Sequence, residues 1–463
     1  MTEVLQTVES VCPECLKRIA GKLVKYGDRV QLEKSCLEHG SFSTTIWKGE
    51  PSFESWFRPK LPYFGGERQQ TGKGCPYDCG LCERHTQRTC TALVEITSRC
   101  NLQCPVCFAD SGGSEADPDL DTLRRMFANI MEQTGGCNLQ LSGGEPTVRK
   151  DLVQVVRLAK EAGIDFIQLN TNGLVLSQDP ELSLQLKDVG LSSAFLQFDG
   201  VDDHVYKELR GRSLVETKCL AIDNLCAAEV GIVLVPTVVR GVNNDQLWDI
   251  VRFGLERQPH VRGVHFQPMS YFGRFPQEFI PDHVTLSEIM SGLSSQSGGI
   301  VHVEDFRPPG CEHALCSFSA KYLMQEDGKL MKLGSNSCDC TPVPAEKGAL
   351  TSIGVTARQW GAVDKTGLEN MGLEDELTKF LNRARTHTFS ISGMAFQDSW
   401  SLNLERLQGC CIHVAQPDGR LIPFCSFNLT ARNGRSLHRP QLQQKILAQI
   451  SHKPDGYNGA DNN

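Results

Sequence analysis

Short apolar runs alternate with amphipathic stretches through the middle of the chain. Apolar residues recur at helical spacing in Leu120–Met131 and again in Leu152–Ala159, which ends before Gly163. Between such stretches, short apolar runs predict strands at Ala92–Thr97, Asn138–Ser142, Asp165–Asn170, Ser193–Asp199, Gly231–Val239 and Gly263–Gln267. This alternation predicts βα units around a parallel sheet.

Six βα repeats are too few for a closed eight-stranded barrel. We therefore expect an α/β fold with a partial (β/α)6 barrel over residues 92–275, its functional loops collected at the carboxyl ends of the strands. Residues 1–60 predict a small metal-binding β module, and residues 61–91 a loop rich in glycine, proline and cysteine. Residues 276–449 predict a C-terminal domain that carries further cysteines, and residues 450–463 a disordered tail.

Composition narrows the class of protein. The chain has 463 residues, 40% of them hydrophobic and 22% charged, as in ordinary globular proteins. The net charge of −8 and the scattered basic residues argue against a nucleic acid partner. The chain shows neither a long apolar span nor a signal peptide pattern, so we expect a cytoplasmic protein.

Cysteine usage points to metal. Ten of the twenty cysteines lie within the first 107 residues. In a reducing compartment, closely spaced cysteines more often bind metal than form disulfides. The crowding therefore predicts several metal sites near the amino terminus.

The strongest signal is the triplet Cys100, Cys104 and Cys107, directly after the first predicted barrel strand. Three thiolates within so short a segment can hold three irons of a 4Fe-4S cluster and leave the fourth iron open. An open coordination position lets a cofactor or substrate bind the metal directly. The alternative is a zinc knuckle, which usually shows paired two-residue spacings.

A second triplet repeats this spacing at Cys75, Cys79 and Cys82. It predicts an auxiliary 4Fe-4S cluster, with Cys90 or a more distant cysteine as fourth ligand. A second cofactor-cleaving cluster and a bare zinc loop are the alternatives.

Further metal ligands are predicted at both ends of the chain. The two pairs Cys12 with Cys15 and Cys36 with His39 suit one mononuclear zinc or iron ion, unless their placement is fortuitous. Towards the C-terminus the candidates for another auxiliary cluster are Cys311, Cys316, Cys411 and Cys425, for which Cys338 or Cys340 could substitute. The alternative for this group is a set of buried free thiols.

The Cys100 triplet resembles the signature of radical S-adenosylmethionine (SAM) enzymes, although Val106 stands where that family usually has an aromatic residue. Three later segments, each at a strand end, are similar to SAM-contacting segments of that family. By resemblance, the SAM-binding residues would be Gly143, Gly144, Glu145, Pro146, Asn170, Asn172, Gln197 and Asp199. The resemblance implies reductive cleavage of SAM to a 5′-deoxyadenosyl radical, with electrons from a donor such as ferredoxin or flavodoxin.

The whole arrangement resembles the tetraether lipid synthase group, which includes proteins once described as pterin methyltransferases. That resemblance implies carbon–carbon bond formation on lipid alkyl chains, and with it possible peripheral contact with a membrane. Three other functions remain open: radical methylation of a pterin or another small molecule, radical modification of a peptide, and electron transfer without catalysis. A lipid substrate predicts a large apolar cavity at the carboxyl ends of the barrel strands, bordered by the Cys75–Cys82 loop.

Overall fold

The structure is a computed structural model that describes residues 2–65, 71–113, 116–276, 281–334, 342–363 and 376–439. The predicted alternative ligands Cys338 and Cys340, and the predicted tail at residues 450–463, lie outside these ranges.

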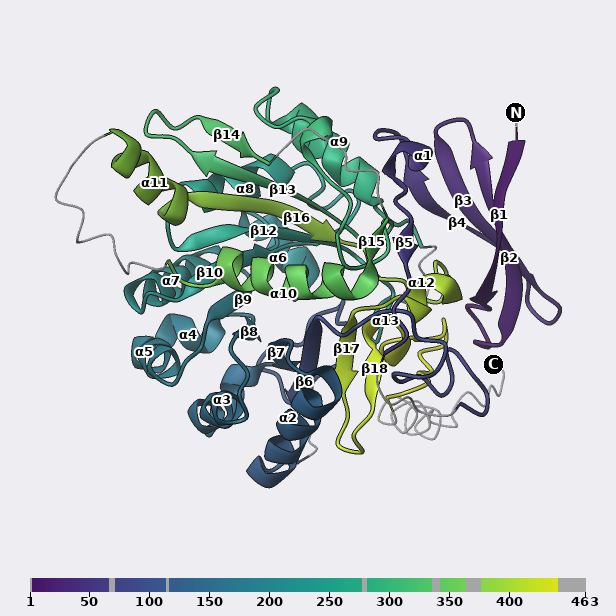
Figure 1. Cartoon of the computed structure of the whole chain (residues 1–463), viewed down its shortest axis with the longest axis horizontal. Coiled ribbons are helices and arrows are strands. Elements are labelled where there is room, and N and C mark those ends of the chain that lie inside the picture. The colour runs from purple at the N-terminus through teal and green to yellow at the C-terminus, as the bar shows by residue number, and fades with distance from the viewer. Residues whose placement is uncertain are drawn as a thin grey trace, which may run out of the picture.

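Four antiparallel strands form the N-terminal module (Figure 1). They are β1 (Thr2–Val11), β2 (Arg18–Tyr26), β3 (Arg29–Cys36) and β4 (Gly40–Lys48), and they pair in chain order. Along β3, buried Val30 and Leu32 alternate with more exposed residues, as in a sheet with one covered face. The prediction of a small β module within residues 1–60 agrees with this arrangement.

A single large sheet makes the body of the molecule. Its predicted strands appear as β6 (Thr91–Thr97), β7 (Asn138–Gly143), β8 (Ile167–Thr171), β9 (Ser193–Gln197), β10 (Gly231–Val235) and β12 (Val261–Pro268). Neighbours in this series pair in parallel and in chain order. The short β11 (Thr237–Val238) pairs with the end of β12.

Helices connect these strands and flank the sheet (Figure 1). They are α2 (Leu120–Thr134), α3 (Leu152–Glu161), α4 (Leu174–Gln178), α5 (Pro180–Asp188), α6 (Asp203–Arg210), α7 (Val215–Ala227) and α8 (Leu247–Leu255). Helix α2 shows why the local sequence forms them: the Asp119 side chain accepts a hydrogen bond from the Thr122 amide at the first turn, and Gly135 ends the helix in the left-handed conformation. The buried face of α2 carries Leu123 and Phe127.

The C-terminal region does not form a separate layer but extends the same sheet at both edges. Strand β16 (Thr388–Met394) pairs in parallel with β12, and β17 (Ile412–Ala415) pairs in parallel with β6. Strands β13 (Ser317–Met324), β14 (Leu330–Leu333) and β18 (Leu421–Pro423) complete the edges in antiparallel fashion. The six predicted βα units are therefore followed by C-terminal strands that local periodicity did not reveal, because strand pairing between distant segments leaves no local pattern.

Helix α10 (Ala345–Trp360) crosses the amino ends of the parallel strands (Figure 1). Its backbone accepts hydrogen bonds from Asn138 at the start of β7, through the carbonyl of Ile353, and from Arg262 in β12, through the carbonyl of Gln359. The remaining α-helices and β-strands are α1 (Phe53–Trp56), β5 (Lys60–Leu61), α9 (Leu286–Gln296), β15 (Val343–Pro344), α11 (Glu376–Thr386), α12 (Leu404–Gln408) and α13 (Phe424–Phe427).

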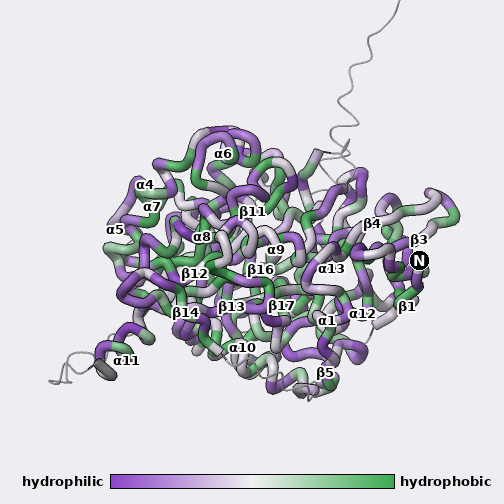
Figure 2. The backbone as a smooth tube through the Cα atoms, turned by 90° about the horizontal axis from the view of Figure 1, so that it is seen from above, coloured by the Kyte–Doolittle hydropathy of each residue, from purple (hydrophilic) through white to green (hydrophobic). Residues whose placement is uncertain are grey.

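One hydrophobic core joins the N-terminal module to the barrel. It contains Val30 and Trp47 of the module together with Phe266 of β12, all buried. In Figure 2, hydrophobic residues are concentrated along central elements such as β12, and hydrophilic residues lie towards the periphery. Such continuous burial fixes the module against the barrel. Within the described residues, no helix combines the length and apolar character needed to cross a bilayer.

Candidate functional site

The SAM loop, which we define as Cys100–Cys107, begins three residues after β6 ends and lies at the carboxyl end of the barrel. The amides of Cys107 and Arg274 each donate to the other's carbonyl oxygen, at 2.9 Å in both directions. Arg274 Nε also donates to the carbonyl of Cys104 at 2.9 Å. The segment after β12 therefore fixes the loop that carries the three predicted cluster ligands.

Two glycines allow the end of β7 to pass close to this loop. Gly143 adopts φ = +120°, and a Cβ atom there would lie 2.1 Å from the carbonyl oxygen of Thr97. A Cβ on Gly144 would lie 2.1 Å from the carbonyl oxygen of Arg99. Any larger residue would clash with backbone atoms, so both predicted SAM-contacting positions require glycine for a physical reason.

Glu145 and Asn172 link the predicted SAM-binding segments to one another. Glu145 Oε2 accepts from the Asn172 amide at 2.6 Å, and its Oε1 accepts from the Thr171 hydroxyl at 2.7 Å. The Asn172 side chain donates to Asn101 in the SAM loop at 2.8 Å. Glu145 thereby orders the ends of β7 and β8 beside the loop, and the next residue, Pro146, is buried.

The structure places Arg210, rather than the predicted Asp199, at the cavity wall. Asp199 is fully buried, and both its oxygens accept from the Arg210 guanidinium at 2.7 Å. Burial raises the pKa of the Cys104 thiol, and the positive charge of the nearby Arg210 opposes this rise. Asp199 is thus a positioning residue for a cation beside the SAM loop, whereas Gln197 lines the cavity as predicted.

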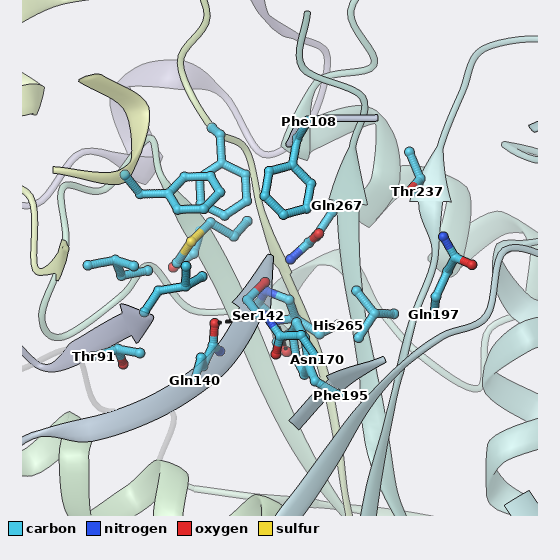
Figure 3. A pocket seen from close by; sticks show the side chains of 18 of the residues that line it. Thr91, Phe108, Gln140, Ser142, Asn170, Phe195, Gln197, Thr237, His265 and Gln267 are labelled. Atoms are coloured by element: carbon cyan, nitrogen blue, oxygen red, sulfur yellow. Dashed lines mark hydrogen bonds between the residues drawn. The ribbon is translucent and has the colours of Figure 1, made fainter. Parts of the chain in front are cut away.

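A cavity of about 720 Å³ occupies the barrel interior (Figure 3). At the carboxyl end it is lined by the three SAM-loop cysteines together with Gly144 and Glu145. At the amino end it reaches Cys90, which precedes β6, and Thr91, the first residue of β6. It also reaches residues of α10 such as Lys347 and Thr351. The predicted cavity therefore exists, but it extends along the strands and is bordered by Cys90 instead of the Cys75–Cys82 loop.

The cavity wall has a polar side and an apolar side. Its polar side carries Gln140, Asn170, Gln197, His265 and Gln267, which project from neighbouring strands (Figure 3). Burial lowers the pKa of His265 to about 4, so this ring is neutral near pH 7. Its apolar side includes Leu93, Phe108, Phe272, Met394, Phe396 and Phe424. Of these residues, only Asn170 and Gln197 were predicted site residues, because single inward-facing residues carry no motif.

The second triplet forms what we call the loop thiol site. The sulfur atoms of Cys75 and Cys79 lie 3.9 Å apart, and the Cys82 thiol interacts with that of Cys75. All three residues are buried. Of the two predicted kinds of fourth ligand for this site, Cys90 needs correction, because the pairing of β6 with β17 holds the Cys90 amide 2.8 Å from the carbonyl of Cys411.

Cys90 instead belongs to an amino-end thiol site with Cys311 and Cys411. Their sulfur atoms all lie within 4.8 Å of one another, and all three residues are buried. Such a compact set of soft donors fits a metal centre. The site borders the cavity at the end opposite to the SAM loop.

The predicted group of four C-terminal cysteines is therefore divided. Cys316 and Cys425 lie outside the amino-end thiol site. Cys316 Sγ accepts from Arg406 at 3.4 Å, and Cys425 Sγ accepts from the Gln397 amide at 3.3 Å. The split arises because Cys411 precedes β17 whereas Cys425 lies in α13, so the two residues face different surroundings.

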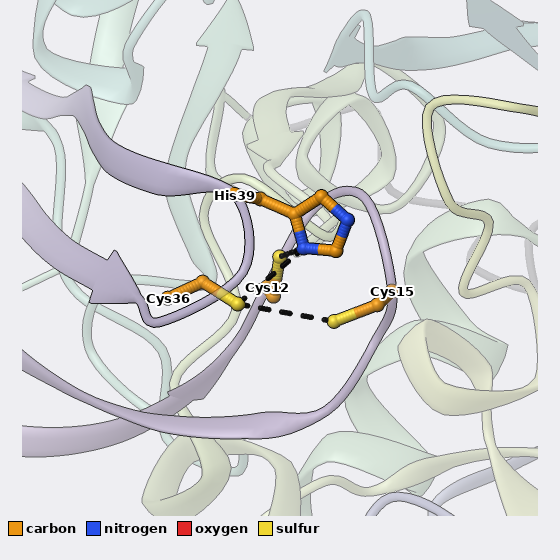
Figure 4. Close-up of side chains that lie close together, drawn as sticks. All are labelled: Cys12, Cys15, Cys36 and His39. Carbon is orange, nitrogen blue, oxygen red and sulfur yellow. Dashed lines mark hydrogen bonds between the residues drawn. The ribbon is translucent and has the colours of Figure 1, made fainter.

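The predicted N-terminal ligands come together at one end of the module (Figure 4). His39 Nδ1 lies 3.6 Å from Cys12 Sγ and 3.5 Å from Cys36 Sγ, and Cys15 Sγ lies 4.0 Å from Cys36 Sγ. The hydrogen bond with His39 lowers the pKa of Cys36 to about 6. A thiolate is the metal-binding form of cysteine, so the group fits a tetrahedral ion.

Comparison with known families agrees with this geometry. Residues 94–254 match the Radical SAM superfamily, and residues 4–48 match the HMPTM N-terminal zinc ribbon domain. Similar solved structures include SuiB from Streptococcus suis, with a TM-score of 0.38, 15% identity and 47% of each chain covered. A methylornithine synthase (PylB) has a TM-score of 0.36 and 18% identity, covering 46% of this chain and 64% of that one.

Similar proteins cover different shares of the chain. A GTP 3′,8-cyclase of Limosilactobacillus fermentum is 30% identical over 47% of this chain and 65% of its own length. A 7,8-dihydro-6-hydroxymethylpterin dimethyltransferase of Methanocaldococcus jannaschii is 31% identical over 94% of each chain. The narrower resemblance to tetraether lipid synthases is untested by these matches and stays a prediction. The chain belongs to the radical SAM superfamily, and within it to the family of the Methanocaldococcus jannaschii protein, whose full length it matches.

Proposed function

We propose that this enzyme activates C–H bonds on long alkyl chains with two SAM-derived radicals, each of which removes one of the two hydrogens that the new carbon–carbon bond replaces. Cys100, Cys104 and Cys107 would hold a 4Fe-4S cluster, which would supply the electron for reductive cleavage of SAM to methionine and the 5′-deoxyadenosyl radical. The protein contributes binding, orientation and exclusion of water. A ferredoxin-like or flavodoxin-like donor would deliver the electrons.

The length of the cavity carries this proposal. It reaches from the amino end of β6 to the SAM loop, and the seven residues of β6 span roughly 20 Å at the usual strand rise. SAM itself would occupy the part next to the SAM loop, and a compact substrate would need only the space beside it. An extended substrate would use the whole length.

The apolar side of the wall suits an alkyl chain. Phe108, Phe396 and Phe424 face the cavity, and the rings of Phe396 and Phe424 lie 4.4 Å apart. A saturated chain offers no hydrogen-bonding groups, so only burial and shape can hold it, at about 0.8 kcal/mol for each buried methylene. The aromatic side chains would provide that burial beside the radical-generating end.

Radical methylation of a pterin is the second candidate. It is favoured by the polar side of the cavity, where Asn170 Oδ1 is buried without a hydrogen-bond partner. Gln140 and Gln267 could also bond to the edge of a heterocycle. The Methanocaldococcus jannaschii relative is named for a pterin substrate, which supports the same alternative. Peptide modification and electron transfer have no comparable feature in their favour.

The two candidates make opposite predictions. The anaerobically reconstituted enzyme would receive SAM, dithionite and either an archaeal-type lipid extract or 7,8-dihydro-6-hydroxymethylpterin. We expect the coupled lipid to lose two hydrogens for each new carbon–carbon bond by mass spectrometry, with two molecules of 5′-deoxyadenosine formed for each bond. Methyl gain on the pterin with unchanged lipids would establish the alternative, and no 5′-deoxyadenosine with either substrate would favour the electron carrier.

A matched pair of substitutions sharpens this test. Phe396→Gln places a polar group on the apolar side, whereas Gln267→Leu removes one from the polar side. For a lipid substrate, Phe396→Gln should lower kcat/KM by roughly tenfold or more, since about 1.4 kcal/mol of lost binding corresponds to a factor of ten. Gln267→Leu should then have the smaller effect, whereas a pterin substrate would reverse the order.

A further inference from the structure

Glu312 borders both the amino-end thiol site and the cavity. It follows Cys311 directly, and its Oε2 lies 3.9 Å from the Cys411 sulfur. The side chain is partly accessible from the cavity, which it lines together with Cys90 and Cys411. The Glu312 carboxylate could therefore bind a metal held by the three thiols and also face a molecule in the cavity.

The carboxylate is held in place without being neutralised by an ion pair. The Ser317 hydroxyl donates to Oε1, which leaves Oε2 directed towards the thiols. Lys60 donates to the backbone carbonyl of Glu312 instead. Among the described residues, no salt bridge uses Glu312.

The thiol site has three sulfur donors, and a 4Fe-4S cluster has four irons to ligate. Cys316 and Cys425, the other predicted ligands, have different contacts, as described above. A carboxylate is a harder and more exchangeable ligand than a thiolate. A cluster with such a ligand facing the cavity could exchange it for a group of the substrate.

We propose that Glu312 is the fourth ligand of a 4Fe-4S cluster on Cys90, Cys311 and Cys411, and that the iron it binds faces the cavity. The inference rests on an auxiliary cluster within the proposed radical SAM enzyme but not on the identity of its substrate. The competing explanation is that Glu312 only orders the loop through Ser317.

The experiment uses the full chain with Cys79, Cys100, Cys104 and Cys107 replaced by alanine, so that neither the SAM-loop cluster nor a cluster at the loop thiol site obscures the spectra. After anaerobic reconstitution with ⁵⁷Fe, this parent is compared with Glu312→Gln and Glu312→Cys by iron and sulfide analysis, Mössbauer spectroscopy and EPR. Glu346→Gln is the matched control, since Glu346 is a partly exposed carboxylate in α10 that pairs with Arg88.

We expect Glu312→Gln to lose one iron from this site and to give the EPR signal of an oxidised three-iron cluster. Glu312→Cys should retain the fourth iron, with a changed Mössbauer signature and a lower reduction potential, because thiolate donates more charge than carboxylate. Cyanide, used as a probe, should alter the parent spectrum but not that of Glu312→Cys. Glu346→Gln should match the parent.

Spectra of Glu312→Gln and Glu312→Cys that are both identical to the parent would overturn the proposal. If Glu312→Gln does not fold, an unchanged Glu312→Cys spectrum alone decides against it. Because these measurements need neither SAM nor substrate, their failure is distinguishable from failure of the proposed reaction.

Discussion

Arg210 donates two hydrogen bonds of 2.7 Å to Asp199, and both side chains are buried beside Cys104. Asp199→Asn would leave the guanidinium buried without a countercharge. We expect a loss of about 3–5 kcal/mol in the free energy of unfolding, the usual cost of removing one partner of a buried pair. Urea denaturation measures this change, and a loss below 1 kcal/mol would contradict the assignment.

Cys104→Ala should abolish formation of 5′-deoxyadenosine, because it removes one of three thiolates from the SAM loop. Liquid chromatography of the products formed with SAM and dithionite measures this loss. Cys219→Ala, in α7 and away from the cavity, is the control and should retain activity. Undiminished turnover in Cys104→Ala would reject the SAM-loop assignment.

Cys79→Ala and Cys90→Ala should remove iron independently. The structure assigns them to the loop thiol site and the amino-end thiol site, so each variant should lose about four irons for each chain and the double variant about twice that number. Cys79→Ala should also keep some uncoupled SAM cleavage. If the double variant lost no more iron than either single one, both cysteines would belong to one cluster.

Lys218 gives a pH-dependent prediction. It is fully buried, donates to the Asn172 carbonyl, and burial lowers its pKa from 10.5 to about 8. Between these pKa values the unfolded chain binds one more proton than the folded chain, so the free energy of unfolding should rise as the pH increases, by about 1 kcal/mol per pH unit.

Replacing Lys218 with methionine should flatten this rise between pH 8 and pH 10, as followed by urea denaturation across that range. The matched control is Lys207→Met, which alters an exposed lysine of α6 and should keep the slope of the parent. An identical slope in Lys218→Met and the parent would show that another group causes it.

The sequence alone determined those features that depend on residues close together in the chain. The six βα units follow from residue periodicity. The N-terminal metal site follows from two pairs of closely spaced ligands, Cys12 with Cys15 and Cys36 with His39. The glycines at the end of β7 were predicted by resemblance to the radical SAM family, and the structure adds the steric reason, because Gly143 and Gly144 pass close to the backbone at Thr97 and Arg99.

Only the tertiary structure decided how distant cysteines group. Cys90 joins Cys411 because β6 pairs with β17, and long-range strand pairing leaves no trace in local sequence. Arg210 and Glu312 gained their positions in the same way, through contacts with Asp199 and Cys411 that no local sequence pattern predicts. Spacing predicts ligands within one loop, whereas the assembly of separate loops depends on the packing of the whole sheet.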